Sequence, residues 1–244
     1  MSEQHVFPDR LKRVVPREHG TRQYGAYNTI RRMGKTIRED QKVKHNQGSI
    51  GASRIRKVCK HCNQGWLNTM EQDCFPVVEQ LIRGEKLTLS RDDQVKLSRI
   101  ATSIAMVGEW LSVPHVSVTQ EERESFRQTL EPPQDWYVFL GRNTSDHNTP
   151  FHFTDGVRSM ENGVDGPKHF AVYTMAMGAV MLHILAVETG NILRADIYAR
   201  NLGLVTICPP TDWIVFPLLR GLDRADIARI RSYALLSFRE QTER

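Results

Sequence analysis

Five apolar runs in the second half of the chain restrict the fold most, because they predict a multistranded β-sheet. Each run is rich in β-branched and aromatic residues and is bounded by turn residues, which is the pattern of successive strands. The runs cover residues 136–142, 150–155, 169–177, 179–187 and 202–210. We predict that they form an antiparallel sheet.

Start and stop signals predict two helices ahead of these runs. Residues 67–84 have a helical pattern, and we expect this helix to bend near Pro76 and to end at Gly84. Ser90 is expected to cap the next helix, since acidic residues follow it in the first turn. The middle of the chain is therefore expected to be helical.

Two further caps complete the outline of the fold. Thr119 and Glu122 have the spacing of a capping box, which predicts a third helix that ends near Leu130. Asp223 is expected to cap a last helix that runs through Ala234. Helices and an antiparallel sheet in separate parts of the chain predict an α+β fold.

The charge is divided unevenly along the chain. Residues 1–70 carry 15 Lys and Arg against 5 Asp and Glu, a net charge of +10, whereas residues 71–244 carry 18 against 23, a net charge of −5. A basic end on an acidic body favours a nucleic-acid partner for that end. The alternative is a basic arm without a specific partner.

The basic end shows little helical periodicity. Residues 22–40 interleave tyrosines and glycines with basic residues, which is compatible with a loop-rich groove lining or a long insertion. Residues 41–59 predict a β-hairpin, because extended runs flank a turn that contains Asn and Gly. The second strand of this hairpin would lead the chain into Cys59.

Cys59 and Cys62 form a C-x-x-C pair, which lets two thiolates reach one ion, at about 2.3 Å each for zinc. The flanking Lys57 and Lys60 would favour the thiolate form. The chain holds four cysteines and no second C-x-x-C pair. Zinc binding and redox chemistry both remain open at this stage. The other cysteines, Cys74 and Cys208, are expected to be small buried apolar residues, and a histidine such as His45 or His61 could still complete a metal site.

Signals for export or membrane insertion are missing from the sequence. There is no apolar run at the N-terminus, and the most apolar segment, 170–187, is short for a membrane span and contains Gly178. We therefore expect a cytoplasmic protein in which disulfides are not formed.

Two segments far apart in the chain together resemble a known family. The sequence EQHVFP at residues 3–8 and VCKHCNQGWLNTMEQ at residues 58–72 are similar to the HNH endonucleases, in the long form with Glu-His-Val-Phe-Pro and Cys-x-x-Cys-Asn-x-Gly-Trp motifs. The resemblance implies a ββα-metal fold that hydrolyses DNA phosphodiester bonds with one divalent ion, Mg²⁺ or Mn²⁺.

The same resemblance assigns roles to individual residues. His5 matches the general base, and Asn63 matches the metal ligand on the helix. Cys59 and Cys62 match one half of a structural zinc knuckle. Gln4 stands where the family places an acidic residue or a histidine, and its neutral amide is a weaker ligand for Mg²⁺ or Mn²⁺.

These departures define the alternatives. Because no second cysteine pair completes the knuckle, we expect a chain that is N-terminally truncated or degenerate relative to the family. The alternative function is a catalytically degenerate HNH-like protein that binds nucleic acid or a protein partner without cleavage. A redox or metal-sensing role for the cysteine pair is a third option.

The predicted organisation has two parts. Residues 1–83 form a small ββα head with a basic insertion, and residues 84–244 form a larger body of helices and antiparallel sheet. Basic residues close to the cysteine pair are expected to contact DNA phosphates, although a solvated strand face is the alternative. They are Arg54, Arg56, Lys57 and Lys60.

Overall fold

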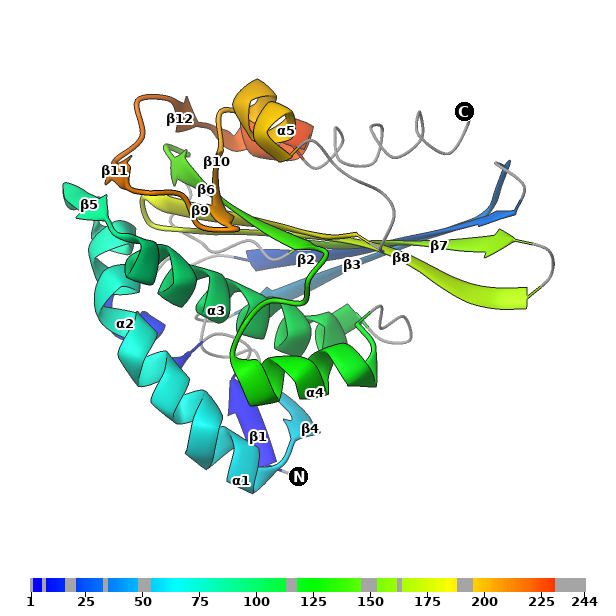
Figure 1. Ribbon diagram of the computed structural model, residues 1–244. Helices are drawn as coiled ribbons and strands as arrows, with labels where there is room; N and C mark the ends of the chain where they lie inside the picture. The colour runs from blue at the N-terminus through cyan, green and yellow to red at the C-terminus, as the bar shows by residue number, and fades with distance from the viewer. Residues whose placement is uncertain are drawn as a thin grey trace.

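An eight-stranded sheet forms the centre of the fold, and helices lie on both of its faces (Figure 1). The computed structural model describes residues 2–5, 8–15, 21–32, 35–47, 54–112, 118–145, 153–161, 164–187 and 195–230. The combination of helices with mainly antiparallel sheets confirms the predicted α+β class.

The strands of this sheet follow the order β10-β6-β9-β8-β7-β2-β3, and β12 pairs with β6 beside this path. Neighbours are antiparallel except for two parallel pairs, β2 with β7 and β12 with β6. Each of the five predicted runs overlaps one of the strands β6 to β10. The bounds are β2 Thr21–Arg32, β3 Lys35–Gln47, β6 Trp136–Asn143, β7 Phe153–Glu161, β8 Val164–Met177, β9 Val180–Val187, β10 Val205–Cys208 and β12 Gly221–Leu222.

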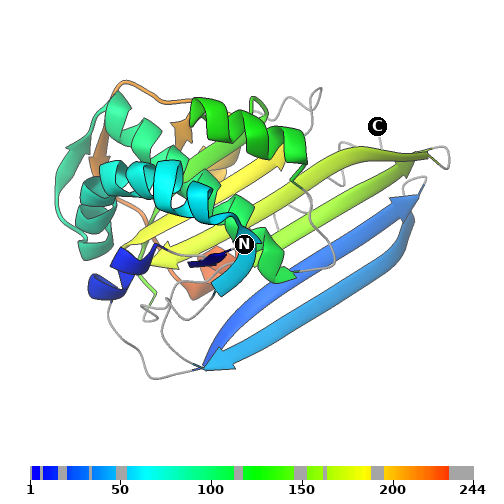
Figure 2. The ribbon, with the colours of Figure 1, turned by 90° about the horizontal axis from the view of Figure 1, so that it is seen from below.

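Two small sheets accompany the large one. Strand β1 (Ser2–His5) pairs with β4 (Arg54–Val58), and β5 (Leu87–Leu89) pairs with β11 (Ile214–Phe216). Both pairs are antiparallel. The β1–β4 pair lies on the same side of the large sheet as helices α2, α3 and α4 (Figures 1 and 2).

The predicted hairpin over residues 41–59 is wrong in its pairing, although both of its strands exist. Strand β3 pairs with β2 and strand β4 pairs with β1, so the two belong to different sheets. Only two residues separate β2 from β3, and Arg32 is paired with Lys35 across this connection. Such a short connection favours pairing between strands that are adjacent in the chain. Most of residues 22–40 therefore form strands and not a loop-rich lining.

Helix α2 ends as predicted at Gly84, whose backbone is left-handed with φ 74°. Glycine adopts this conformation without steric cost. Pro76 lies inside the helix. The helices are η1 Asp9–Arg13 (3-10), α1 Lys60–Cys62, η3 Asn63–Leu67 (π), α2 Asn68–Arg83, α3 Arg91–Gly108, η4 Glu109–Ser112 (3-10), α4 Gln120–Thr129 and α5 Ala195–Leu202, and residues 224–230 are also helical.

The predicted caps of α3 and α4 are confirmed as reciprocal capping boxes. At α3, Ser90 Oγ accepts the N–H of Asp93 at 3.2 Å, and the Asp93 carboxylate accepts the N–H of Ser90 at 2.9 Å. At α4, Thr119 and Glu122 exchange the same two bonds, at 3.1 and 2.8 Å. These bonds satisfy backbone N–H groups that have no partner within the helix.

A similar exchange caps the last described helix. The N–H of Asp226 donates to the Asp223 carboxylate at 2.8 Å, and the N–H of Asp223 donates back at 3.3 Å. These bonds confirm the prediction that Asp223 caps this helix. The predicted end of this helix, at Ala234, lies outside the described residues.

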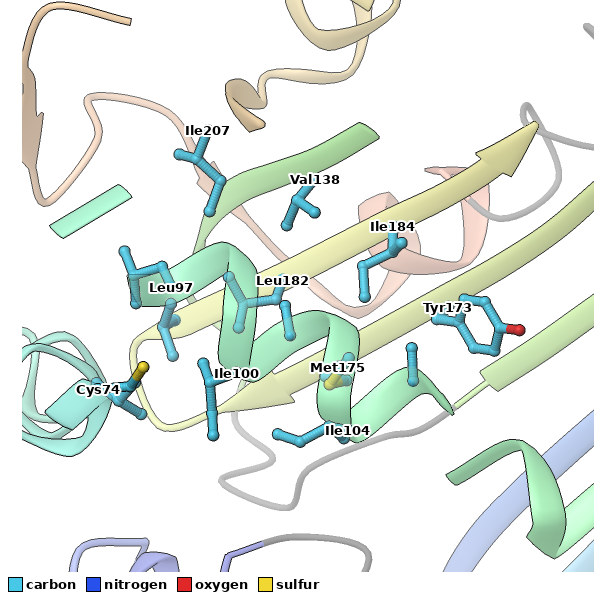
Figure 3. Close-up of a cluster of buried hydrophobic side chains, with 14 of the residues drawn as sticks. Cys74, Leu97, Ile100, Ile104, Val138, Tyr173, Met175, Leu182, Ile184 and Ile207 are labelled. Carbon is cyan, nitrogen blue, oxygen red and sulfur yellow. The ribbon is translucent and has the colours of Figure 1, made fainter. Parts of the chain in front are cut away.

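The main hydrophobic core lies between α3 and one face of the sheet, which we call the helix-side face. Leu97, Ile100 and Ile104 of α3 face Met175 of β8 and Leu182 of β9 (Figure 3). All five side chains are buried. Burying a side chain of this size contributes about 1.5–3 kcal/mol, so this apolar stripe attaches α3 to the sheet.

The opposite face of the sheet carries α5 and a buried polar group. His183 of β9 lies 2.9 Å from the Thr174 hydroxyl and 2.8 Å from the Tyr198 hydroxyl of α5, each through one ring nitrogen. Burial lowers the pKa of His183 to about 3, so the ring stays neutral. His183 therefore has a structural role in this setting, where it joins β8 and β9 to α5.

The large sheet joins segments from both predicted parts of the chain. Strands β2 and β3 precede residue 83, yet β2 pairs with β7 over eight residues, from Gly25–Phe153 to Arg32–Met160. The basic insertion is thus an extension of the sheet, and the boundary near residue 83 stays a prediction. Among the described residues, no helix has the length and apolar character needed to cross a membrane.

Candidate functional site

Strands β1 and β4 bring the two ends of the HNH-like pattern together. Gln4 pairs with Ile55 and His5 pairs with Arg54, so residues about fifty positions apart in the sequence are neighbours across one ladder. Strand β4 leads through Cys59 directly into α1 and η3. The result is a β1–β4 pair followed by a helix that begins at Lys60, with Asn63 three residues further along.

Cys59 caps the N-terminus of this helix. Its backbone is extended, at φ −71° and ψ 152°, and its sulfur accepts the N–H of Cys62 at 3.1 Å. Hydrogen bonds from the Cys62 thiol and from backbone N–H groups lower the pKa of Cys59 below its ordinary value. The pKa of Cys62 is raised, first because its thiol donates to Cys59 and second because it is partly desolvated. Of the two thiols, Cys59 is therefore the one that ionises first.

Asn63 lies where the helix is irregular. Its N–H donates to the carbonyl of Cys59 at 2.9 Å, and its side chain is partly buried. Two residues later, Gly65 leaves helical geometry with φ −94° and ψ −115°, so the chain kinks between the turn that carries Asn63 and helix α2. Helix α2 then continues from Asn68. We call the turn before the kink, residues 60–64, the Asn63 turn.

Helix α4 supplies two residues that lie next to the turn formed by residues 59–62, which we call the cysteine turn. The sequence did not indicate these neighbours. The ring of Trp66 meets Phe126 of α4 edge-on, with centroids 6.0 Å apart. The indole N–H of Trp66 is buried without a hydrogen bond of standard geometry, and it favours the thiolate form of Cys62. The guanidinium of Arg127 acts on Cys62 in the same direction. No local pattern could reveal these contacts, because α4 lies about sixty residues further along the chain.

Lys57, one of the predicted DNA-binding residues, faces the ring of Trp110 in η4. The Nζ atom lies 4.8 Å from the ring centroid, and the guanidinium of Arg123 from α4 lies 5.2 Å from the same centroid. A cation over a tryptophan ring is attracted by the negative face of the ring. These contacts attach strand β4 to the body, and phosphate binding by Lys57 stays a prediction.

The residue before Trp110 in the chain, Glu109, is a fully buried carboxylate. Glu109 accepts a hydrogen bond from Arg123 Nη2 at 2.7 Å, from the Val118 N–H at 3.0 Å and from the Tyr173 hydroxyl at 3.3 Å. Arg123 also donates to the carbonyl of Met106 at 2.6 Å. A buried charge that is paired and hydrogen-bonded in this way holds its surroundings in one geometry.

Among the acids of the head that the structure describes, Glu71 has a pKa well above its ordinary value. Burial raises the pKa of Glu71 to about 7, and the positive charge of Arg10 opposes the rise only in part. Arg10, in η1, lies over the ring of Phe75 at 5.8 Å from the centroid. The two charges are thus close enough to interact, which suits a structural role for Glu71 beside Arg10.

The other two cysteines lie in apolar surroundings. Cys74 of α2 is buried in the main core, and the partly buried Cys208 packs against this core. Burial raises their pKa values to about 12 and about 11, so both remain neutral thiols. This agrees with the prediction that they are small apolar residues. His61 is exposed, and the side chain of His45 is not described.

The cysteine pair offers two of the four ligands that a zinc knuckle would need. A structural zinc site needs four ligands, and Cys59 and Cys62 provide two thiolates in one turn. Within the described part of the chain, no cluster of three or more His, Cys, Asp or Glu side chains is placed to hold an ion. The carboxamide of Asn63 offers one oxygen donor, which suits Mg²⁺ or Mn²⁺ better than zinc.

For four predicted site residues the structure describes the backbone alone: Gln4, His5, Arg54 and Arg56. Their strand positions are known, and their roles stay predictions. Lys57 and Lys60 are exposed, as phosphate contacts require. Comparisons with models of known families, with curated proteins and with solved structures gave no match. The site therefore rests on its own geometry and on the resemblance of its motifs.

Proposed function

We propose that this protein is an HNH-like nuclease that hydrolyses DNA phosphodiester bonds, and that it does so in the cytoplasm. The observation that supports the proposal is the pairing of β1 with β4 followed directly by the Asn63 turn. This arrangement joins the two sequence segments that resemble the family, although about fifty residues separate them.

In this proposal the residues of the head have three different roles. His5 acts as the general base that takes a proton from the attacking water. The oxygen of Asn63 helps to hold a divalent ion, which when bound stabilises the charge on the scissile phosphate. Cys59 and Cys62 hold the start of the helix and contribute half of a structural zinc site.

Nicking of supercoiled plasmid DNA tests the proposal. We expect the purified protein to produce relaxed circles with Mg²⁺ or Mn²⁺ and none with EDTA. His5→Ala is expected to lower the nicking rate by about 10²–10⁴-fold, the usual contribution of a positioned base, and Asn63→Ala to raise the metal concentration needed. His61→Ala is the matched control, because His61 is an exposed histidine of the same head. Nicking by His5→Ala at the unmodified rate would contradict the assignment of the base.

The alternative function, nucleic-acid binding without cleavage, is favoured by Gln4. A neutral amide at this position binds a hard cation more weakly than a carboxylate does. The variant Gln4→Glu separates the two functions. A gain of metal-dependent nicking in Gln4→Glu, with none in the unmodified protein, would support a degenerate site. Equal nicking by both proteins would support the enzyme.

A further inference from the structure

The β2–β3 hairpin extends the helix-side face of the sheet beyond the helices. Tyr173 of β8, which bonds to Glu109 in the main core, pairs with Thr154 of β7. Thr154 pairs with Ala26 of β2, and Ala26 pairs with Lys42 of β3. Residues directly opposite one another in a ladder belong to the same face of a sheet. This row therefore identifies Lys42 as a position of the helix-side face.

Successive residues of a strand belong to opposite faces of the sheet, so this row assigns a face to every position of the hairpin. The basic residues are divided unequally between the two faces. Between the pairs Thr21–Gln47 and Ile30–Arg38, together with the partner residues 153–158 of β7, every Lys and Arg falls on the helix-side face. These residues, which we call the basic sheet face, are Arg22, Arg38, Lys42, Lys44 and Arg158. The helix-side positions of this region include one acid, Asp40.

The opposite face of the same strands has the reverse character. It carries no Lys or Arg over this region and two acids, Glu39 and Asp155. Past the register shift at Ile30 the tip of the hairpin is again basic, with Arg31, Arg32 and Lys35. Over this region the basic residues are thus confined to one face, and a one-sided basic stripe is the electrostatic footprint of a surface that binds a polyanion.

The basic sheet face lies on the side of the molecule that carries the head. In Figure 2 the helices α2 and α3 lie over the other part of the sheet, and no described helix crosses β2 and β3. Strands β1 and β4 lie on this same side in both views (Figures 1 and 2). A polyanion on the hairpin would thus be on the side of His5 and Asn63.

We propose that the basic sheet face binds the phosphate backbone of duplex DNA and presents it to the head. The nine residues from Arg22 to Ile30 span about 27 Å at about 3.4 Å per residue. Successive phosphates of one strand are about 3.4 Å apart along the duplex, so the face matches roughly eight base pairs. The inference rests on the proposed function for the choice of DNA, and it adds the surface that docks the substrate.

Two charge-matched variants of the hairpin test this surface. The triple variant Arg38→Gln/Lys42→Gln/Lys44→Gln removes three positive charges from the basic sheet face. The control Gln23→Glu/Gln41→Glu/Gln47→Glu adds three negative charges to the opposite face of the same two strands. Both change the net charge by the same amount, and circular dichroism melts establish that both fold. Binding of the full chain to a 30-base-pair DNA duplex is followed by fluorescence anisotropy in EDTA, at several salt concentrations.

The first variant is expected to weaken binding about 100-fold near 0.1 M salt and to reduce the salt slope of log K by about 2.7, because each lost phosphate contact removes about 0.9. The control is expected to weaken binding only a few-fold with an unchanged slope, since salt screens charges beyond about 10 Å. Equal losses in the two variants, or no loss in the first, would overturn the proposal. Binding of a duplex RNA or of polyglutamate in place of DNA would overturn the choice of partner.

The outcome is separable from that of the proposed function. Duplex binding that depends on the basic sheet face, in a protein that does not nick DNA, supports this surface and counts against catalysis. Nicking that continues unchanged in the Arg38→Gln/Lys42→Gln/Lys44→Gln variant overturns this surface and leaves the nuclease in place.

Discussion

Two contacts on the same side of the sheet differ in what holds them together. Under α3 the contact is apolar, with Ile100 and Ile104 buried against β8 and β9. Between the head and α4 the contact is polar and aromatic, because Lys57 and Arg123 both lie over the ring of Trp110. Apolar packing depends little on pH or salt, whereas charged contacts respond to both. The body is therefore expected to be the constant part of the molecule and the head junction the adjustable part.

The largest effect is expected from breaking the buried pair of Glu109 and Arg123. Arg123→Met leaves a fully buried carboxylate without its cation, and the loss in unfolding free energy should be about 3–5 kcal/mol. Urea denaturation measures this loss. Arg127→Met is the control, since Arg127 pairs with Glu124 at an exposed site of the same helix. A similar loss in both variants would show that burial does not decide the cost.

A smaller effect with a definite sign is expected at Glu71. Its pKa is about 7 in the folded protein against an ordinary value of 4.5, so the folded state binds a proton that the unfolded state releases between these values. Stability should therefore fall as the pH rises from about 4.5 to about 7 and then level off. Glu71→Gln removes this dependence and should stabilise the protein at pH 8 by about 3 kcal/mol.

The measurement for Glu71 is a series of denaturation curves from pH 4.5 to pH 8. Glu79→Gln is the matched control, because Glu79 lies on the same helix and pairs with Arg83 at the surface. The control should keep the fall in stability with rising pH. If the two variants behave alike, burial of Glu71 is not the source of the pH dependence.

The smallest effect is expected at Lys57. Lys57→Met removes the charge above Trp110 and keeps most of the aliphatic chain, and the loss should be about 0.5 kcal/mol, the usual size of an exposed cation–π contact. Lys60→Met removes a neighbouring exposed charge for comparison. Protection of the β4 amides in hydrogen exchange should fall in the first variant alone. Unchanged protection would mean that the Trp110 contact does not attach the head.

The parts of the fold that local signals govern were predictable from the sequence. The capping boxes at Ser90 and Thr119 and the left-handed end at Gly84 involve residues at most four apart, so the sequence carries the complete motif. The strands β6 to β10 were predictable as elements because each has its own apolar pattern. The pairing of β4 was not, since backbone hydrogen bonds alone do not distinguish β1 from β3 as a partner.

The candidate site also has some features that the sequence predicts and others that depend on the tertiary structure. The cysteine turn and Asn63 are one short motif, and the sequence placed them together. The neighbours of that turn come from α4, and the pKa of Glu71 depends on how completely the fold covers it. Contacts and burial of this kind depend on several elements at once, and no window of the sequence contains them.

By itself, then, the sequence determined the helices α2 to α4 with their caps, the existence of strands β6 to β10, the basic character of the first seventy residues and the chemistry that Cys59, Cys62 and Asn63 can offer. Only the tertiary structure decided that β1 meets β4, that β2 meets β7 and that the basic residues of the hairpin gather on the face next to the head. The physical reason is range. Capping and periodicity act within a few residues, whereas strand pairing and burial join segments separated by fifty or more residues and are set by the packing of the whole chain.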